Sequence, residues 1–501
     1  MTLAAVGELG GDSYGRVPYH QQMGQRVLIL AAGIGSGHNI AAGVLESCFR
    51  AAREVDAVQK LDILEATNEV YRTLYDDGYF ALVEAVPWLV GWGYDANDPP
   101  FKLAKWISLW DRLNTTATAK AIKAFRPDIV VCTHFLPTRL VSLMLTRGVL
   151  DTRLAVVTTD YDFQGLWLSN AFNHFFVARA ETKAYMSAIG VPEDRITVSG
   201  IPVRPGLNAE VDRDAVLRRY DLRSDRPIML ISAGAAGGAY TETIVQQTMR
   251  IANNFQAVVV CGRNDQLKSQ IEGLTAFQRD RYRVLGYTND MADLMRTATL
   301  FVGKPGGLSS SECMAAGLPM VLIHPIPGQE VRNSDFLLEE GAAVRCNYQT
   351  TVGYKIDQLL AEPDRISRMA ESARRIGRPD AGAQIASQVL NDQSPPLWIS
   401  HAAQKSVLAS SEQGIAAANL YAGRRVRTLI DAPTGLSAGV ITTAQLNSLL
   451  PENVETTGSR TSIALSVDQV SALRKRTEPG LTFTLRRILD KASDLKLELR
   501  S

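Results

Sequence analysis

The sequence predicts an α/β protein in which two Rossmann-like, doubly wound domains follow each other along the chain. Two observations support this fold class: short apolar runs recur with helix-like segments between them, and a glycine-rich turn opens each half. Continuous runs of valine, isoleucine and leucine that end at glycine, proline or aspartate are typical of strands buried on both faces of a parallel sheet. With 501 residues, the chain is long enough for two or three domains with cores of their own.

The expected strands fall into two series. The first series is Val27–Ala32, Ile129–Thr133, Leu154–Thr159 and His174–Ala178. The second series is Ile228–Ser232, Ala257–Cys261, Arg283–Leu285, Leu300–Val302 and Met320–Ile323. Between them, one glycine and two prolines in the segment 200–205 interrupt any regular element, which places a domain boundary there.

This division leaves shorter segments at both ends of the chain. The Pro395-Pro396 pair and the serine- and glutamine-rich stretch up to Gly414 are typical of a linker. We therefore expect an N-terminal extension at 1–25, a first domain at 26–205, a second domain at 206–392, a linker region at 393–458 and a small C-terminal appendage at 459–501.

Composition and charge exclude several classes of function. The formal net charge is +1, so there is no electrostatic basis for nucleic acid as a partner. The five cysteines are scattered and no CxxC spacing indicates a metal, a pattern typical of reduced thiols. The first 25 residues lack a basic start followed by an apolar core, so we expect no signal peptide. No apolar stretch approaches the roughly 20 residues that span a bilayer, so we expect a cytoplasmic protein whose membrane contact is peripheral.

The most informative segment runs from Gly303 to Arg332, GKPGGLSSSECMAAGLPMVLIHPIPGQEVR. A short strand ends in a glycine-rich turn, a helix is expected to begin near Ser309, and a second strand follows. This βαβ unit can grip a phosphate with the amides at the start of its helix. We expect Glu312 in the first helical turn, where its carboxylate can accept hydrogen bonds from ribose hydroxyls.

Taken together, KPGG, the following Ser-Glu, AxGLPM, PIPGQE and Asn333 resemble the C-terminal signature of glycosyltransferase family 28. More narrowly, they are similar to monogalactosyldiacylglycerol synthases and to the processive diacylglycerol glucosyltransferases of Gram-positive bacteria. The resemblance covers about residues 26 to 390. It implies the GT-B architecture, two Rossmann-like domains facing a cleft, with a last helix near Ala383–Leu390 that returns to the first domain.

The resemblance also implies the chemistry. It indicates an inverting transfer from a UDP-hexose to a diacylglycerol-type lipid, without a metal or other cofactor. Two alternatives remain open: transfer of N-acetylglucosamine to a lipid-linked cell-wall precursor, and a non-catalytic module that senses UDP-sugar. PIPGQE and the CGRN segment at 261–264 favour the glycerolipid branch. The sequence does not distinguish glucose from galactose.

By the same resemblance, most donor-binding residues belong to the second domain. A small-residue loop after the strand Ile228–Ser232 would face the diphosphate, because small side chains let the backbone approach an anion. Arg263 would offset the diphosphate charge, Tyr287 would pack on the uracil, and the PIPGQE turn would hold the hexose. The expected UDP-sugar residues are Gly35, Gly37, Ser232, Gly234, Ala235, Arg263, Gly286, Tyr287, Gly306, Gly307, Leu308, Ser309, Glu312, Pro327, Gly328, Gln329, Glu330 and Asn333.

The first glycine turn, GIGSGH at 33–38, follows the first expected strand. Its glycines alternate, and His38 takes the third glycine position of a dinucleotide fingerprint, so hydride transfer is disfavoured. We expect His38 at the carboxyl edge of the sheet, where an imidazole can accept a proton from an attacking hydroxyl. The resemblance makes His38 the candidate general base. The alternative is a histidine that only caps the next helix.

Two further strand ends contribute candidates. Asp160-Tyr161-Asp162 has the form of a DxD metal motif, but TTDYDF resembles a segment of family 28 that needs no metal. We expect Asp160 to border the acceptor site or to orient His38. Pro137 and His134 also approach this edge, and His134 is interpreted as a plain loop histidine.

Four of the six tryptophans lie between residues 86 and 113: Trp88, Trp92, Trp106 and Trp110. Lysine and arginine side chains are interleaved with them, a composition that suits a bilayer interface. Trp106 and Trp110 would share one helical face. Family members insert an aromatic, basic region here, which implies docking on an anionic membrane. The alternative is a stripe of core aromatic residues.

The segment 459–499 has an order of its own. Arg460–Ser466 is interpreted as a strand, Val467–Arg474 as a helix and Phe483–Leu499 as a longer amphipathic helix. This order resembles a ribbon–helix–helix module. So short an element buries too little surface to be stable alone, so we expect a homodimer through this tail if it folds. The alternative is an unrelated helical or partly disordered tail.

Overall fold

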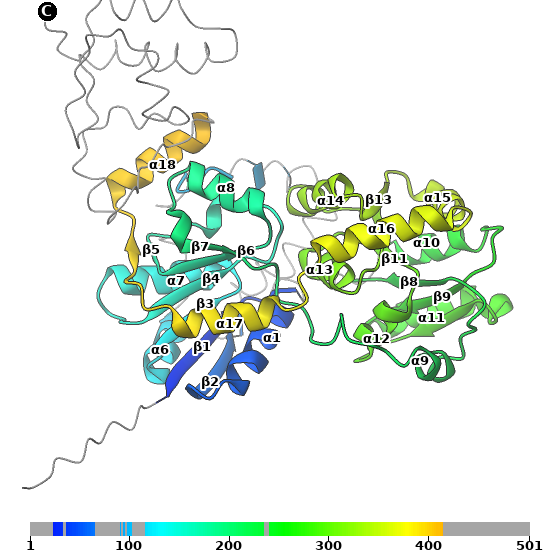
Figure 1. Ribbon diagram of the computed structural model, residues 1–501, viewed down its shortest axis with the longest axis horizontal. Coiled ribbons are helices and arrows are strands. Elements are labelled where there is room, and N and C mark those ends of the chain that lie inside the picture. The colour runs from blue at the N-terminus through cyan, green and yellow to red at the C-terminus, as the bar shows by residue number, and fades with distance from the viewer. Residues whose placement is uncertain are drawn as a thin grey trace, which may run out of the picture.

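The computed structural model describes residues 24–33, 37–65, 91, 94–95, 98–102, 116–234 and 240–413. Several sequence predictions fall outside these residues and are not tested here: Gly35, Ala235, Trp88, Trp92, Trp106, Trp110 and the tail from residue 459. The described residues form two lobes, each built on its own sheet (Figure 1).

The first lobe is a six-stranded parallel sheet with the order β2-β1-β3-β4-β6-β7. Its strands are β1 (Gln25–Ala31), β2 (Val55–Asp62), β3 (Ile129–Cys132), β4 (Arg153–Val157), β6 (His174–Val177) and β7 (Ile196–Val198). Its helices are α1 (Gly37–Ala51), α6 (Thr116–Phe125), α7 (Phe135–Thr146), η1 (Gly165–Trp167), α8 (Ala180–Ala188) and η2 (Glu193–Arg195). Every residue of β3 is buried, as expected for a strand covered on both faces.

The second lobe repeats this plan, with the strand order β10-β9-β8-β11-β12-β13. Its strands are β8 (Ile228–Ser232), β9 (Gln256–Val260), β10 (Tyr282–Leu285), β11 (Leu300–Gly303), β12 (Met320–Ile323) and β13 (Ala343–Cys346). Its helices are α9 (Arg213–Arg219), α10 (Thr241–Thr248), α11 (Asp265–Leu274), η3 (Ala276–Gln278), α12 (Met291–Thr297), α13 (Gly307–Ala315), α14 (Gln329–Glu339), η4 (Gln349–Thr351), α15 (Val352–Leu360) and α16 (Pro363–Ile376). Two doubly wound parallel sheets confirm the predicted fold class.

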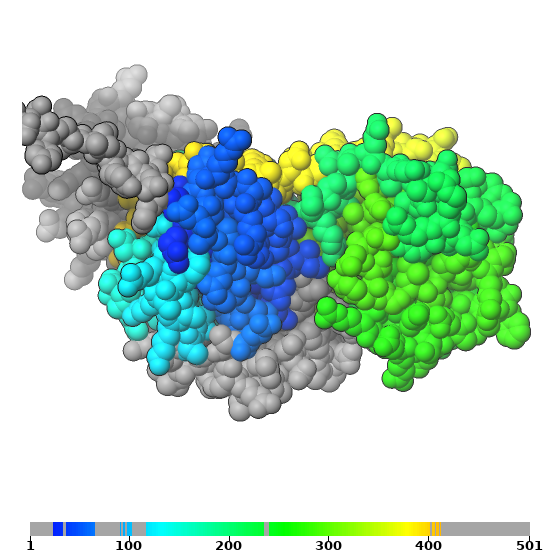
Figure 2. All heavy atoms as spheres, turned by 90° about the horizontal axis from the view of Figure 1, so that it is seen from below, coloured from blue at the N-terminus to red at the C-terminus, as the bar shows by residue number. Residues whose placement is uncertain are grey.

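The last helix of this pair of domains, α17 (Ala381–Asn391), returns to the first lobe and packs on α1. Its apolar face, including Ile385 and Val389, joins the core that contains Val27 and Ile29 of β1. The space-filling view shows the two lobes with an indentation where they meet, and the yellow residues of α16 and α17 pass along one side of both (Figure 2).

The stretch expected to be a linker begins differently. Leu397–Trp398 form β14, which pairs antiparallel with β5 (Ala171–Phe172), and α18 (His401–Gln413) follows. Ile399 and Val407 are buried in the core of the first lobe. The serine- and glutamine-rich composition predicted a linker, but apolar side chains spaced along residues 397–407 dock this segment on the sheet.

Candidate active site

His38 is held against the carboxyl ends of two neighbouring strands. Its Nδ1 lies 3.0 Å from the carbonyl oxygen of Thr133, which follows β3, and 2.8 Å from Oγ1 of Thr159, which follows β4. The Thr133 hydroxyl in turn donates to the backbone carbonyl of His38, at 3.1 Å. Parallel strands bring these residues to the same sheet edge, as the sequence predicts for His38.

The contact with Thr133 favours one tautomer of His38. A carbonyl oxygen can only accept, so the tautomer that satisfies this contact donates from Nδ1 to Thr133 and leaves Nε2 unprotonated, whereas in the other tautomer Nδ1 would accept from the Thr159 hydroxyl. Burial lowers the pKa of His38 to about 4, against the opposing effects of the Thr133 hydrogen bond and the Asp62 charge. The imidazole is therefore neutral near pH 7, with Nε2 as an available proton acceptor.

The capping alternative for His38 does not fit this geometry. The helix α1 begins at Gly37, so His38 lies inside its first turn and its ring contacts other strands. The capping role belongs to His134, which is 2% exposed and whose Nδ1 accepts from the amide of Leu136 at the start of α7. His134 is therefore not a plain loop histidine: its ring meets that of His38 edge-on, with 4.5 Å between the centroids. Pro137 is buried in the same first turn.

Asp62, at the end of β2, braces the glycine turn before α1. Its carboxylate accepts from the backbone amide of Gly33 at 3.1 Å and from the side chain of Asn39 at 2.8 Å. A Cβ atom on Gly33 would lie 2.6 Å from Oδ2 of Asp62, so a larger residue there would have to displace the carboxylate that braces the turn. Asp62 is not predicted from the sequence, because β2 mixes polar with apolar residues and has no strand-like apolar run.

Asp160 faces the second domain and not His38. Its Oδ1 accepts from Nε2 of Gln329 at 3.0 Å and from Nδ2 of Asn333 at 3.3 Å. Burial raises the pKa of Asp160 to about 6, although both amide hydrogen bonds oppose the shift. The expectation that Asp160 orients His38 is therefore wrong, because Thr133 and Thr159 hold that ring. Asp160 instead connects the first domain to the turn that is expected to hold the hexose.

The start of α13 lies directly against the first domain. The helix begins at Gly307, two residues before the position expected from the sequence, after an extended Gly306 without a side-chain cap. A Cβ on Gly307 would lie 2.0 Å from the carbonyl oxygen of Thr159, so only glycine fits. Leu308, in the same turn, lies beside Gly37 of the first domain. Without a side-chain cap, first-turn amides such as that of Ser309 are suited to hold an anion.

Glu312 lies in the second turn of α13, not the first, because the helix starts earlier than expected. Its carboxylate is buried and forms an ion pair with Arg204. Burial raises the pKa of Glu312, and the charge of Arg204 opposes this shift. Arg204 is therefore part of the site. From the sequence it is expected only to lie at the domain boundary.

The turn after β12 is braced from within. Glu330 accepts a 2.7 Å hydrogen bond from the amide of Ile326, across the turn that contains Pro327 and Gly328. Burial raises the pKa of Glu330 to about 7, with Lys304 and the Ile326 amide acting in the opposite direction. Asn333 donates to the carbonyl oxygen of Pro305 at 3.1 Å and accepts from the amide of Tyr161 at 3.0 Å. Glu330 and Asn333 therefore fix the turn, and Asn333 joins it to the loop after β11 and to Tyr161 of the first domain.

A second cluster lies at the carboxyl ends of β8, β9 and β10. The guanidinium carbon of Arg263 lies 5.2 Å from the ring centroid of Tyr287, and Tyr287 is 64% exposed. Gly286, just before it, lies near the carbonyl oxygen of Gly262. Gly234 has a positive φ of 70° with open space beside it, and its amide donates to Oγ of Ser232. An exposed aromatic ring next to a cation and an open glycine turn suit a base and its diphosphate.

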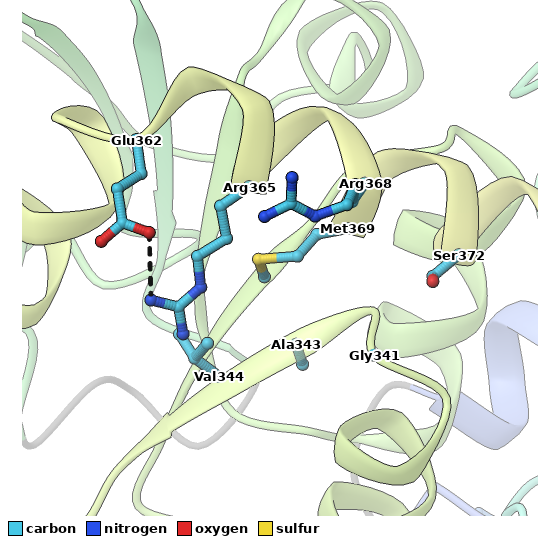
Figure 3. A pocket seen from close by; sticks show the side chains of 8 residues that line it. All are labelled: Gly341, Ala343, Val344, Glu362, Arg365, Arg368, Met369 and Ser372. Carbon is cyan, nitrogen blue, oxygen red and sulfur yellow. Dashed lines mark ion pairs between the residues drawn. The ribbon is translucent and has the colours of Figure 1, made fainter.

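A cavity of about 560 Å³ lies elsewhere, between the amino end of β13 and α16 (Figure 3). Arg365, Arg368 and Met369 of α16 line it, opposite Gly341 and Val344. It contains none of the predicted site residues, and ligands of open parallel sheets bind at the carboxyl ends of the strands. The candidate site is therefore the pair of facing rims.

Within the described parts of the chain, no group of three or more histidine, cysteine or carboxylate side chains could hold a metal ion. Both carboxylates of the DxD-like segment have protein partners, since Asp162 forms ion pairs with Arg179 and Arg332. No helix in the same residues is both long enough and apolar enough to span a bilayer.

Two facing Rossmann-like domains, joined by a returning C-terminal helix and carrying site residues on both rims, define a GT-B protein. Family models agree: residues 38–203 match monogalactosyldiacylglycerol (MGDG) synthase, and residues 229–385 match the glycosyltransferase family 28 C-terminal domain. A solved structure of S. aureus MnaA with UDP has the same fold at 12% identity, with a TM-score of 0.50 over 73% of this chain and 96% of that one.

Among curated relatives, a processive diacylglycerol beta-glucosyltransferase of Bacillus cereus (strain AH187) is 30% identical over 378 residues, or 73% of this chain and 93% of the relative. A processive diacylglycerol beta-glucosyltransferase of Bacillus thuringiensis (strain Al Hakam) is 29% identical over 380 residues, or 73% and 94%. The chain belongs to the diacylglycerol glycosyltransferases of glycosyltransferase family 28.

Proposed function

We propose that this protein transfers a hexose from a UDP-hexose to the hydroxyl group of a diacylglycerol-type lipid, with inversion at the anomeric carbon. The observation that carries the proposal is His38, a neutral imidazole whose Nδ1 is tied to Thr133 and whose Nε2 is left to accept a proton. It lies on the rim that faces the start of α13. The names of the curated relatives support the donor and acceptor classes.

In this mechanism, Nε2 of His38 takes the proton from the acceptor hydroxyl. The hydroxyl oxygen forms a bond to the anomeric carbon while the bond between that carbon and the UDP oxygen breaks. The electron pair leaves with UDP, and the amides at the start of α13 and the Arg263 guanidinium stabilise the charge that develops there. A single in-line displacement inverts the anomeric centre.

The donor hexose would contact the turn at Gln329 and Glu330. In the structure Gln329 donates to Asp160, and Glu330 is held by the Ile326 amide, so both lie at the junction of the domains. The carboxylate of Glu312 is paired with Arg204, so we propose that it binds the ribose together with that side chain. We expect no resident metal, so EDTA should leave the transfer rate unchanged.

The direct test is incubation of the protein with diacylglycerol liposomes and a panel of labelled UDP-sugars, followed by separation of the lipids. We expect label from a UDP-hexose in a glycolipid, together with release of UDP. A parallel arm offers UDP-N-acetylglucosamine and a lipid-linked peptidoglycan precursor, and label there alone would favour the cell-wall alternative. If no sugar releases UDP with any acceptor, the result contradicts the proposal and favours the alternative of a UDP-sugar sensor.

We also propose that the tryptophan-rich sequence at 86–113 docks the protein on the anionic inner face of the membrane. Its support is the sequence, in which Lys102, Lys105 and Arg112 lie near four tryptophans. The protein should co-sediment with anionic vesicles, and binding should weaken as salt rises. Replacement of Trp106 and Trp110 by alanine should reduce vesicle binding while hydrolysis of soluble UDP-sugar persists. If the double variant unfolds, these side chains belong to the core.

A separate proposal concerns residues 459–501, which we expect to pair two copies of the chain. The structure shows where the chain should be truncated to test this proposal. A cut after Asp392 would remove β14 and α18, which pack on the first domain. A cut after Gln413 removes residues 414–501 and keeps β14 and α18, and it should convert dimer to monomer in light scattering without loss of activity. An unchanged mass contradicts the proposal.

A further inference from the structure

Arg332 joins the second domain to Asp95 and Asp98 of the first domain. No sequence motif predicts this connection. Arg332 lies on α14, one turn after Gln329. Its Nη1 lies 3.1 Å from Oδ1 of Asp98 and its Nη2 lies 3.2 Å from Oδ2, while Nη2 also lies 3.0 Å from Oδ1 of Asp95. A two-pronged guanidinium–carboxylate pair fixes orientation as well as distance.

The same two segments touch through their backbones. Gly328 has a φ of 91°, and a Cβ there would lie 2.6 Å from Cγ of Tyr94. A Cβ on Gly91 would lie 2.8 Å from Cβ of Pro327. The guanidinium carbon of Arg332 lies 5.1 Å from the ring centroid of Tyr94. Gly91 and Tyr94 therefore pack on the turn that is expected to hold the hexose.

On its other side, this segment rests on the rim that carries His38. A Cβ on Gly165 would lie 2.2 Å from the carbonyl oxygen of Asp98. Trp167, in the same short helix η1, has its ring centroid 6.2 Å from that of His134. The ring of His134 in turn contacts His38. Arg332 is thus connected through Asp98, the helix η1 and His134 to His38, the proposed base.

Arg332 carries the positive charge that the surrounding carboxylates share. Its guanidinium faces three carboxylates, because Oδ2 of Asp162 also lies 3.5 Å from Nη1. Arg179 offsets part of the charge of Asp162. Without Arg332, Asp95, Asp98 and Asp162 would lie together with no shared cation. Their repulsion would push Tyr94, Asp95 and Asp98 away from the turn.

We propose that Arg332 is a positioning residue that couples the donor turn at 327–333 to the acceptor side of the site. By holding Tyr94, Asp95 and Asp98 on that turn, Arg332 brings an acceptor hydroxyl beside His38 to the hexose beside Gln329. This inference rests on the proposed transfer reaction. It assigns to Arg332 a role in the encounter of the two substrates and none in holding UDP.

The kinetic test compares transfer to diacylglycerol liposomes with hydrolysis of UDP-hexose by water, in the parent and in Arg332→Ala. Transfer should fall about tenfold, because misplacement of two reactants is costly, while hydrolysis stays within a few-fold. Arg332→Lys, which keeps the charge and loses the fork, should lie between. Arg375→Ala removes an exposed ion pair with Glu340 inside the second domain and should leave both rates unchanged.

A double-mutant cycle shows whether Arg332 acts through Asp98. Asp98→Asn should produce the same selective loss, and the double variant should be no worse than either single one. Equal losses of transfer and hydrolysis, no loss of either, or additive effects would each overturn the coupling. Thermal melting of each variant separates these outcomes from unfolding.

A second readout does not depend on the acceptor. With no ligand present, the amides of residues 94–95 and 98–102 should exchange more slowly in the parent than in Arg332→Ala, because the ion pairs of Arg332 hold this segment. If the parent transfers no sugar to any lipid, the proposed function fails and this exchange measurement alone decides the coupling. If these amides exchange equally fast in the parent and in Arg332→Ala, the coupling is wrong.

Discussion

The two rims of the site are built in opposite ways. On the first-domain rim, the His38 ring is enclosed and held by Thr133 and Thr159, with the buried His134 against it. On the second-domain rim, Tyr287 is largely exposed and α13 begins without a side-chain cap. The first rim has its hydrogen bonds made before any ligand arrives. On the second rim Glu330 and Asn333 brace the donor turn in the same way, but the start of α13 has no side-chain cap and the Tyr287 ring is open.

This difference indicates a division of labour. A fixed, neutral imidazole suits a proton transfer, because its orientation is set in advance and no reorganisation is needed at the moment of reaction. Exposed rings and free amides suit a charged ligand with a flat base, because binding completes contacts that the protein leaves open. Changes on the first rim should therefore affect turnover, and changes on the second should affect donor affinity.

The largest expected effect is that of His38→Ala. Turnover should fall by about 10²–10⁴-fold, the usual contribution of a general base, while the dissociation constant for UDP changes by less than about threefold. His38→Gln can still donate to the Thr133 carbonyl but cannot accept the proton, so it should lose as much. Steady-state kinetics and calorimetry of UDP binding measure the two effects. If His38→Gln keeps near-parental turnover, the ring only fills space.

The next effect tests the contact between the rims. Gly307→Ala would place a methyl group against the Thr159 carbonyl, and neither backbone can move away without separating the domains. Since a misplacement of about 1 Å can cost roughly 10²-fold, turnover should fall by about that factor although each sheet keeps its own core. Gly273→Ala on α11, where nothing lies within 4 Å, is the matched control. Normal turnover in Gly307→Ala would show that the rims do not need this close approach.

A smaller effect is expected on the open rim. Tyr287→Ala should raise the KM for UDP-hexose about tenfold with little change in kcat, because stacking on a base is worth about 1–3 kcal/mol. Tyr354→Ala, which removes an equally exposed tyrosine from α15, should change neither constant. A drop in kcat with an unchanged KM would reverse the division of labour between the rims.

The smallest effect concerns stability and pH. The pKa of Glu330 rises from 4.5 to about 7 on folding, so its protonated form is favoured in the native state. Its contribution to the free energy of unfolding is therefore complete below pH 4.5 and is lost as the pH rises through 7. His38 acts in the opposite sense, because its lowered pKa costs stability as the pH falls from 6.5 towards 4.

Urea titrations of the parent and Glu330→Gln at pH 5 and pH 8 separate these two contributions. The glutamine can still accept from the Ile326 amide but has no proton to lose, so the variant should gain stability relative to the parent at the higher pH. An identical pH dependence in both proteins would mean that Glu330 titrates normally.

The sequence predicts the interior of each sheet better than its edges. Strands β3, β8 and β12 are continuous apolar runs, because helices cover both of their faces. The sequence analysis missed β2, β7 and β13, which lie at sheet edges and mix polar with apolar residues. An edge strand is stabilised by pairing with its neighbour along the sheet, and that pairing leaves a weaker signature in composition.

By itself the sequence determined the fold class, the family and the glycine turns, because these depend on local patterns of apolar residues and on short motifs. Only the tertiary structure decided which side chains hold one another. Asp160 reaches Gln329 and not His38, Glu312 pairs with Arg204, and Arg332 meets Asp98, and the members of each pair lie more than one hundred residues apart. Such pairs form because parallel strands deliver distant loops to one sheet edge and because two domains face each other, and no spacing along the chain encodes that meeting.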